Sequence, residues 1–179
     1  WSFKKDLDFF KKKTTNLFEK SIVIMGYNTW ESLPNNFLDN RKNYIITSKA
    51  SYSENKDIYF FKSLNDALYN AYKNIMDQEN IWVIGGKQLY NEAFKHKDLN
   101  YIYHTLITSD DFKCDTFINF FEKKYLTKYY IEDIDRNTNK KYILEFNKYK
   151  LIENGEIKYL KLLEKEKNKG IKKNGRNGI

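Results

Sequence analysis

Proline, cysteine and histidine are scarce in this 179-residue sequence, and it contains no long apolar run. The single cysteine, Cys114, excludes an intrachain disulfide and is typical of a reducing compartment, so we expect a cytoplasmic location. No stretch approaches the roughly 20 apolar residues that a membrane-spanning helix needs, so we expect no membrane partner. His96 and His104 stand apart, so no histidine or cysteine cluster predicts a metal site.

Hydrophobic residues make up 41% of the chain and aromatic residues 17%, which allows a sizeable core and argues against wholesale disorder. The net charge is +8, and basic residues are concentrated near the C-terminal end, from Lys165 to Arg176. Such a charge fits an acidic or phosphorylated partner, a phosphate-bearing small molecule, or a solvated basic surface. No ladder of interleaved basic and aromatic residues stands out, so we expect no nucleic-acid partner.

Apolar strand-like runs alternate with segments of helical periodicity along most of the chain. This alternation predicts an α/β fold with a mostly parallel sheet and a late antiparallel hairpin. A further amphipathic helix, predicted over 155–168, follows the last strand and belongs to a linker or a second domain. The predicted strands are 20–26, 43–48, 57–63, 80–86, 100–107, 125–134 and 140–151, and the other predicted helices are 3–19, 29–33, 63–75 and 88–94.

Three segments carry residues whose chemistry is ambiguous when each is taken alone. Asp6 in the first turn of a helix either complements the helix dipole or holds a cationic or amidine-like group in an apolar cleft. Gly26, followed by Thr29 as a predicted helix cap, is either a phosphate-binding corner or a plain strand-to-helix corner. Gly85 and Gly86 lack the G-x-G-x-x-G spacing, so they indicate either a phosphate contact or only a tight turn.

Taken together, these segments resemble dihydrofolate reductase. The N-terminal stretch matches W-x4-D-L-x2-F-x3-T, and "MGYNTWESLP", "LDNRKNYIITS", "IWVIGGKQLY" and "IYHTLI…CDTF" follow in the family's order and spacing. The resemblance covers about residues 1–150. It implies a reductase domain over 1–151, with a central mixed sheet flanked by helices and the family's first strand missing.

The resemblance implies a role for each matching position. Asp6 would be the only ionisable group in the folate pocket, supported by Thr105, and would promote protonation of the pterin imine nitrogen. NADPH would supply the hydride, and dihydrofolate and antifolates would be the ligands. Arg41 would take the glutamate carboxylate of the folate with its guanidinium fork. The implied substrate-binding residues are Trp1, Leu7, Phe10, Leu33, Leu38, Arg41, Ile84 and Tyr90, and the implied cofactor-binding residues are Gly26, Asn28, Thr29, Thr47, Ser48, Lys49, Gly85, Gly86, Lys87, Gln88, Leu89 and Thr116.

The chain also departs from the family pattern. Tyr27 stands where the family usually has Arg or Lys in contact with cofactor phosphate, which leaves Lys49 as the nearest cation for a 2′-phosphate. Between Thr105 and Asp115 the chain is one residue longer than is typical. Because the first strand and the mobile loop before Trp1 are missing, we expect a fragment with low activity and marginal stability.

The tail, residues 152–179, resembles the opening of thymidylate synthase, with Tyr159, Gly170 and Arg176 among the matching positions. This resemblance implies a bifunctional parent, a homodimer through its synthase domain, that couples dUMP-to-dTMP methylation to dihydrofolate reduction. Arg176 would hold the nucleotide phosphate, or it is a solvated charge. Two alternatives remain for the first domain: a reductase-fold module that binds pterin without turnover, and a pyrimidine reductase of riboflavin synthesis.

Overall fold

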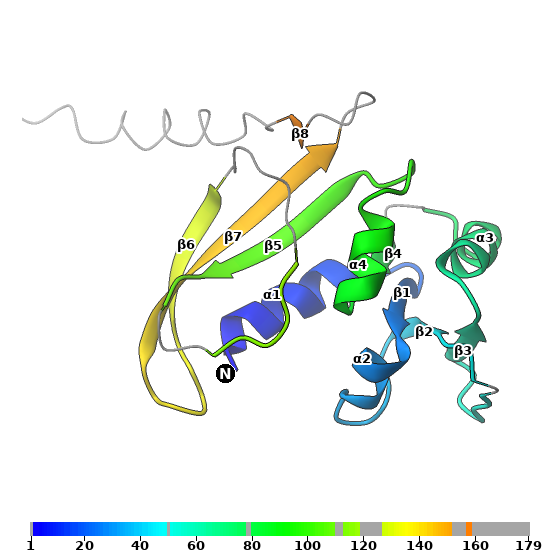
Figure 1. The fold of residues 1–179 in the computed structure, drawn as a ribbon, viewed down its shortest axis with the longest axis horizontal. Coiled ribbons are helices and arrows are strands. Elements are labelled where there is room, and N and C mark those ends of the chain that lie inside the picture. The colour runs from blue at the N-terminus through cyan, green and yellow to red at the C-terminus, as the bar shows by residue number, and fades with distance from the viewer. Residues whose placement is uncertain are drawn as a thin grey trace, which may run out of the picture. The chain divides into compact units, whose positions relative to one another are not determined.

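A computed structural model of the chain describes residues 2–49, 51–77, 80–109, 113–118, 127–151 and 157–158. Contacts divide the chain into two compact units. The first unit comprises residues 1–6, 98–113 and 120–179, and the second comprises residues 7–97 and 114–119. Each unit has its own hydrogen-bonded sheet (Figure 1).

The second unit contains a parallel sheet with the strand order β3-β2-β1-β4. Its central strand, β1, is buried along almost its whole length, as expected for a parallel strand covered on both faces. Helices follow the strands, which confirms the predicted alternation. The strands are β1 (Ser21–Gly26), β2 (Arg41–Ile46), β3 (Ile58–Phe61) and β4 (Ile81–Val83), and the helices are α2 (Tyr27–Glu31), α3 (Leu64–Asn74) and α4 (Lys87–Ala93). The helix α1 (Lys4–Thr14) starts in the first unit and continues into the second from Leu7.

Successive side chains of β1 enter two different clusters of the core, because a strand points its side chains alternately to opposite faces. Ile22 and Ile24 pack with the apolar residues of α3 and α4. Val23 and Met25 pack with Ile45 and with partly buried side chains that include Leu33 and Leu38. The 3.6-residue periodicity of α3 is therefore confirmed, as is its cap, because the Ser63 hydroxyl accepts a hydrogen bond from the Asp66 amide.

The first unit contains an antiparallel sheet with the order β5-β7-β6, and β8 also pairs with β7. The strands are β5 (Tyr101–Ile107), β6 (Thr127–Ile134), β7 (Lys141–Leu151) and β8 (Ile157–Lys158). The β6–β7 pair is the predicted late hairpin, and the α/β class is confirmed. The parallel and antiparallel strands form two separate hydrogen-bonded sheets among the described residues.

The bounds of two predicted helices are wrong. The helix predicted over 3–19 ends at Thr14, because the Thr15 hydroxyl donates to the Lys11 carbonyl and the Asn16 side chain accepts from the Phe18 amide. The helix predicted over 29–33 begins at Tyr27 and has Gly26 as its cap, so Thr29 lies inside α2 and does not cap it.

The predicted helix at 155–168 is contradicted where it can be compared. Ile157 and Lys158 form β8, whose backbone satisfies the edge of β7, while residues 159–168 lie outside the described part of the chain. Among the described residues, no helix has the length and apolar character needed to cross a bilayer.

Candidate active site

A glycine corner lies at the carboxyl ends of β1 and β4, in the second unit. The Gly26 amide donates to the Gly85 carbonyl at 2.8 Å, and the Ile84 amide donates to the Ile24 carbonyl at 2.9 Å. These bonds continue the β1–β4 pairing beyond the strands and hold the two glycine segments side by side. The peptide bond between Gly85 and Gly86 is cis.

Side chains on Gly85 and Gly86 would be crowded by their neighbours in this corner. A Cβ on Gly86 would lie 3.3 Å from the Thr29 hydroxyl oxygen, and a Cβ on Gly85 would lie 3.0 Å from the Tyr90 ring. Gly85 also has a φ of +110°, which side-chain-bearing residues rarely adopt. Gly85 therefore has to be a glycine, whereas a side chain on Gly86 would require the Thr29 hydroxyl to shift by a few tenths of an ångström.

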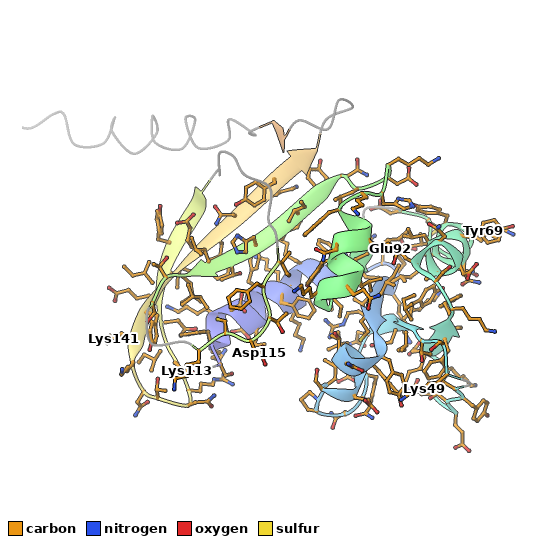
Figure 2. The ribbon with its side chains drawn as sticks, viewed as in Figure 1. Lys49, Tyr69, Glu92, Lys113, Asp115 and Lys141 are labelled. Carbon is orange, nitrogen blue, oxygen red and sulfur yellow. The ribbon has the colours of Figure 1, made fainter. Side chains whose placement is uncertain are left out.

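The loop after β2 lies at the same edge of the sheet, because Ile46 at the end of β2 is in register with Gly26 at the end of β1. Thr47 is buried, and its hydroxyl accepts from the Lys49 amide at 3.1 Å. Lys49 is exposed (Figure 2), and its ammonium lies 4.5 Å from the centroid of the Tyr27 ring. This edge is where open α/β sheets bind ligands.

A buried arginine lies at the opposite end of β2. Arg41 is only 5% exposed, donates to the Thr14 hydroxyl at 2.8 Å from Nη1, and donates to the Asp39 carbonyl from Nε. Its guanidinium carbon is 5.8 Å from the Phe10 ring centroid. Burial lowers the pKa of Arg41 from its usual range, opposed by the Asp39 charge. The remaining guanidinium donors can bind an anion such as a carboxylate.

Asn43 is a supporting residue that the sequence-based prediction did not include. It is fully buried, its amide nitrogen donates to the carbonyls of Leu38 and Arg41, and its carbonyl oxygen accepts from the Leu38 amide. These bonds fix the chain between Leu38 and Arg41. The signal for it was a polar residue next to the apolar end of β2, Tyr44–Ile46, because a polar side chain that is buried there demands local hydrogen bonds.

Asp6 and Thr105 both belong to the first unit. Asp6 lies in the first turn of α1, as predicted, and is half-buried. Thr105 is half-buried on β5, in register with Phe146 of β7. Among the described residues, no hydrogen bond or ion pair engages the Asp6 carboxylate, so none joins it to Thr105.

The segment before α1 is anchored to the β6–β7 turn. The Asp135 carboxylate accepts from the Ser2 amide at 2.7 Å and from the Thr138 hydroxyl at 2.7 Å, and the Arg136 amide donates to the Ser2 carbonyl. The hydrogen bond from Ser2, followed by that from Thr138, lowers the pKa of Asp135. These bonds hold the start of the helix that carries Asp6.

Other implied site residues have varied surroundings. The Leu89 side chain is 6% exposed in the core cluster with α3, so only its backbone is available to a ligand. Leu7 is 50% exposed, and Tyr90 is half-buried with its ring stacked on Phe94. Ile84 is partly buried. Trp1 and Arg176 lie outside the described residues. Besides Leu7 and Lys49, the implied site residues with exposed side chains are Asn28, Ser48, Lys87, Gln88 and Thr116.

The fold and these residues define an α/β protein with a glycine corner and a cation at the carboxyl edge of a parallel sheet. Within the described part of the chain, no group of three acidic, histidine or cysteine residues could hold a metal ion. Residues 1–151 match the family model described as dihydrofolate reductase. The chain therefore belongs to the dihydrofolate reductase family.

Individual relatives agree with this family. The chain is 37% identical over 147 residues to the dihydrofolate reductase of Schistosoma mansoni, covering 77% of each protein. It is 37% identical over 130 residues to that of Pneumocystis carinii, covering 65% of this chain and 63% of the relative. The solved structure of the Schistosoma mansoni protein aligns with a TM-score of 0.69 at 30% identity, covering 84% of this chain and 86% of that one.

A longer relative covers the tail as well. The bifunctional dihydrofolate reductase-thymidylate synthase of Paramecium tetraurelia is 31% identical over 189 aligned residues, an alignment that spans 100% of this chain. This chain spans only 38% of that protein.

Proposed function

We propose that the chain catalyses NADPH-dependent reduction of 7,8-dihydrofolate to tetrahydrofolate. The observation that carries this proposal is the family match over residues 1–151, with an acidic residue, Asp6, retained in the first turn of α1. The named relatives are dihydrofolate reductases, which supports the same reaction for this chain.

Asp6 is the proposed catalytic residue. Its carboxylate has free acceptor oxygens among the described residues, so it can accept hydrogen bonds from the amino group and ring N–H of a pterin. A negative charge at that place favours a proton on the imine nitrogen, delivered through water. Thr105 would support this carboxylate.

Arg41 is the proposed residue for the glutamate part of the substrate. Thr14 and the Asp39 carbonyl use two of its donors, which leaves others for a carboxylate. Phe10 and the partly buried Leu33 and Leu38 supply apolar surface for the neighbouring ring of the substrate. Trp1, Leu7, Ile84 and Tyr90 complete the proposed substrate contacts.

The residues at the carboxyl edge of the parallel sheet fit a dinucleotide. The glycine corner carries no side chain of its own at residues 85–86, and Lys49 offers a cation for phosphate. NADPH supplies the hydride when it is bound. The chain's own contribution is to orient it with Gly26, Thr29, Thr47, Ser48 and the start of α4.

The test is substrate-dependent oxidation of NADPH by the natural protein, with any residues that precede Trp1 retained. We expect oxidation with dihydrofolate and none with a pyrimidine precursor of riboflavin. A protein that binds a pterin antifolate but leaves NADPH unoxidised would instead fit a binding module. Oxidation only with the pyrimidine would contradict the proposal.

We further propose that residues 152–179 open a thymidylate synthase domain in a bifunctional, cytoplasmic parent that dimerises through that domain. The alignment of the whole chain with the Paramecium tetraurelia protein supports this, and Arg176 is the proposed phosphate-binding residue. The test is the coding sequence beyond Ile179. A stop codon there, or an unrelated domain, would contradict the proposal.

A further inference from the structure

Tyr27 is an uncharged aromatic residue beside the segment proposed to bind the dinucleotide phosphates. It is the first residue of α2, directly after Gly26 at the end of β1. The Gly26–Ile46 register brings this position level with the loop that follows β2. The side chain at 27 therefore lies at the edge of the sheet proposed for the dinucleotide.

Within the described ranges, the Tyr27 ring is in cation–π contact with Lys49. The Lys49 ammonium is 4.5 Å from the ring centroid, within the range of a cation–π contact. Lys49 is otherwise exposed, and a flexible exposed lysine would sample many rotamers. The ring also packs against Trp30, with centroids 5.3 Å apart, so its own position is restrained.

Glu31 interacts with the hydroxyl of Tyr27. It follows Tyr27 by one helical turn, and a hydrogen bond to its side chain, then desolvation and its negative charge, raise the pKa of the Tyr27 hydroxyl. The phenol therefore stays neutral and donates to the carboxylate. This donation increases electron density on the ring and strengthens its attraction for an ammonium.

We propose that Tyr27 is a positioning residue that holds the Lys49 ammonium for the phosphate monoester that distinguishes NADPH from NADH. This role rests on the proposed function. Tyr27 has no positive charge of its own, but its ring holds the positive charge of Lys49 nearby. Selectivity for the phosphate then depends on one lysine and one aromatic face.

The test compares the full chain and its variants by calorimetric titration with 2′,5′-ADP and with 5′-AMP, which lacks the 2′-phosphate. We expect Tyr27→Leu to reduce the preference for 2′,5′-ADP roughly two- to fivefold, the usual strength of an exposed cation–π contact. Tyr27→Phe keeps the ring and should retain most of the preference. Lys49→Gln should reduce it about tenfold or more, because a charge-assisted contact is lost.

Two controls separate this role from a structural one. Tyr52→Leu removes another tyrosine, 84% exposed, and should leave the preference unchanged. In a Lys49→Gln background, Tyr27→Leu should have no further effect on the preference, because Tyr27 acts through Lys49.

Three results would overturn the role of Tyr27. The first is an equal loss of affinity for both nucleotides in Tyr27→Leu. The second is an unchanged preference for 2′,5′-ADP in Tyr27→Leu. The third is a further loss of this preference when Tyr27→Leu is added to Lys49→Gln. If the unsubstituted chain oxidises NADPH with dihydrofolate, each of these overturns only Tyr27. A failure to bind 2′,5′-ADP, with no such oxidation, overturns the proposed cofactor and the role of Tyr27 together.

Discussion

At the scale of single residues, the chain places its cations in contrasting environments. Arg41 is buried and bonded to Thr14, whereas Lys49 is exposed and held over an aromatic ring. Burying a guanidinium is costly unless its donors are satisfied, so Arg41 depends on its neighbours for both its orientation and its stability.

Thr14→Val tests that dependence. The substitution keeps the shape of the side chain but leaves a buried donor of Arg41 unpaired, so we expect a loss of about 1–3 kcal/mol in unfolding free energy. The KM for dihydrofolate should rise because the guanidinium loses its orientation. Urea unfolding and steady-state kinetics measure the two effects. Thr15→Val is the matched control, because the Thr15 hydroxyl, just beyond α1, donates to the Lys11 carbonyl and does not accept from Arg41.

At the scale of elements, hydrogen bonds made by side chains decide where helices begin and end. Side-chain hydrogen bonds of Thr15 and Asn16 end α1 before the predicted helix would end. The start of another predicted helix instead pairs with β7 and forms β8. The Asp135 carboxylate works in the same way, since it binds the segment before α1 to the β6–β7 turn. Periodicity alone could not predict these endings because their partners are set by loop geometry.

Asp135 also makes the anchor sensitive to pH. Its pKa is lowered in the folded chain, so the stabilisation is present above the ordinary aspartate pKa of about 4 and is lost as pH falls through the folded-state value. We expect the urea concentration at the unfolding midpoint to decrease as the pH is lowered from about 5 to about 2. In Asp135→Asn this decrease should be smaller. Glu132→Gln, on an exposed carboxylate of β6, is the control. An equally steep fall in Asp135→Asn would contradict the anchor.

At the scale of the whole molecule, much of the fold could be predicted because parallel strands have continuous apolar runs that differ from amphipathic helices. The run Ile22–Met25 and the apolar stripe of α3 both occur where the pattern predicted them. The division into two sheets could not be predicted, because strand pairing depends on contacts between distant segments.

The candidate site could likewise be predicted only in part. Gly85, Gly86 and Arg41 could be named from motifs because their residue types are required by backbone space or by charge. The contacts of Asn43 and Tyr27 could not be named, because they depend on loops that only the fold brings to one edge. The sequence therefore predicts which residue types a site needs, but it does not predict which residues they contact.

The central claim is that Asp6 supplies the charge for dihydrofolate reduction, and the pH dependence of NADPH oxidation in Asp6→Asn tests it most directly. Asp8→Asn, an exposed acid two residues along the same helix, is the matched control. We expect Asp6→Asn to lose at least tenfold in kcat/KM at neutral pH and to recover rate as acid protonates the substrate directly, while Asp8→Asn keeps the unsubstituted profile. An Asp6→Asn profile equal to that of the unsubstituted protein would contradict the account.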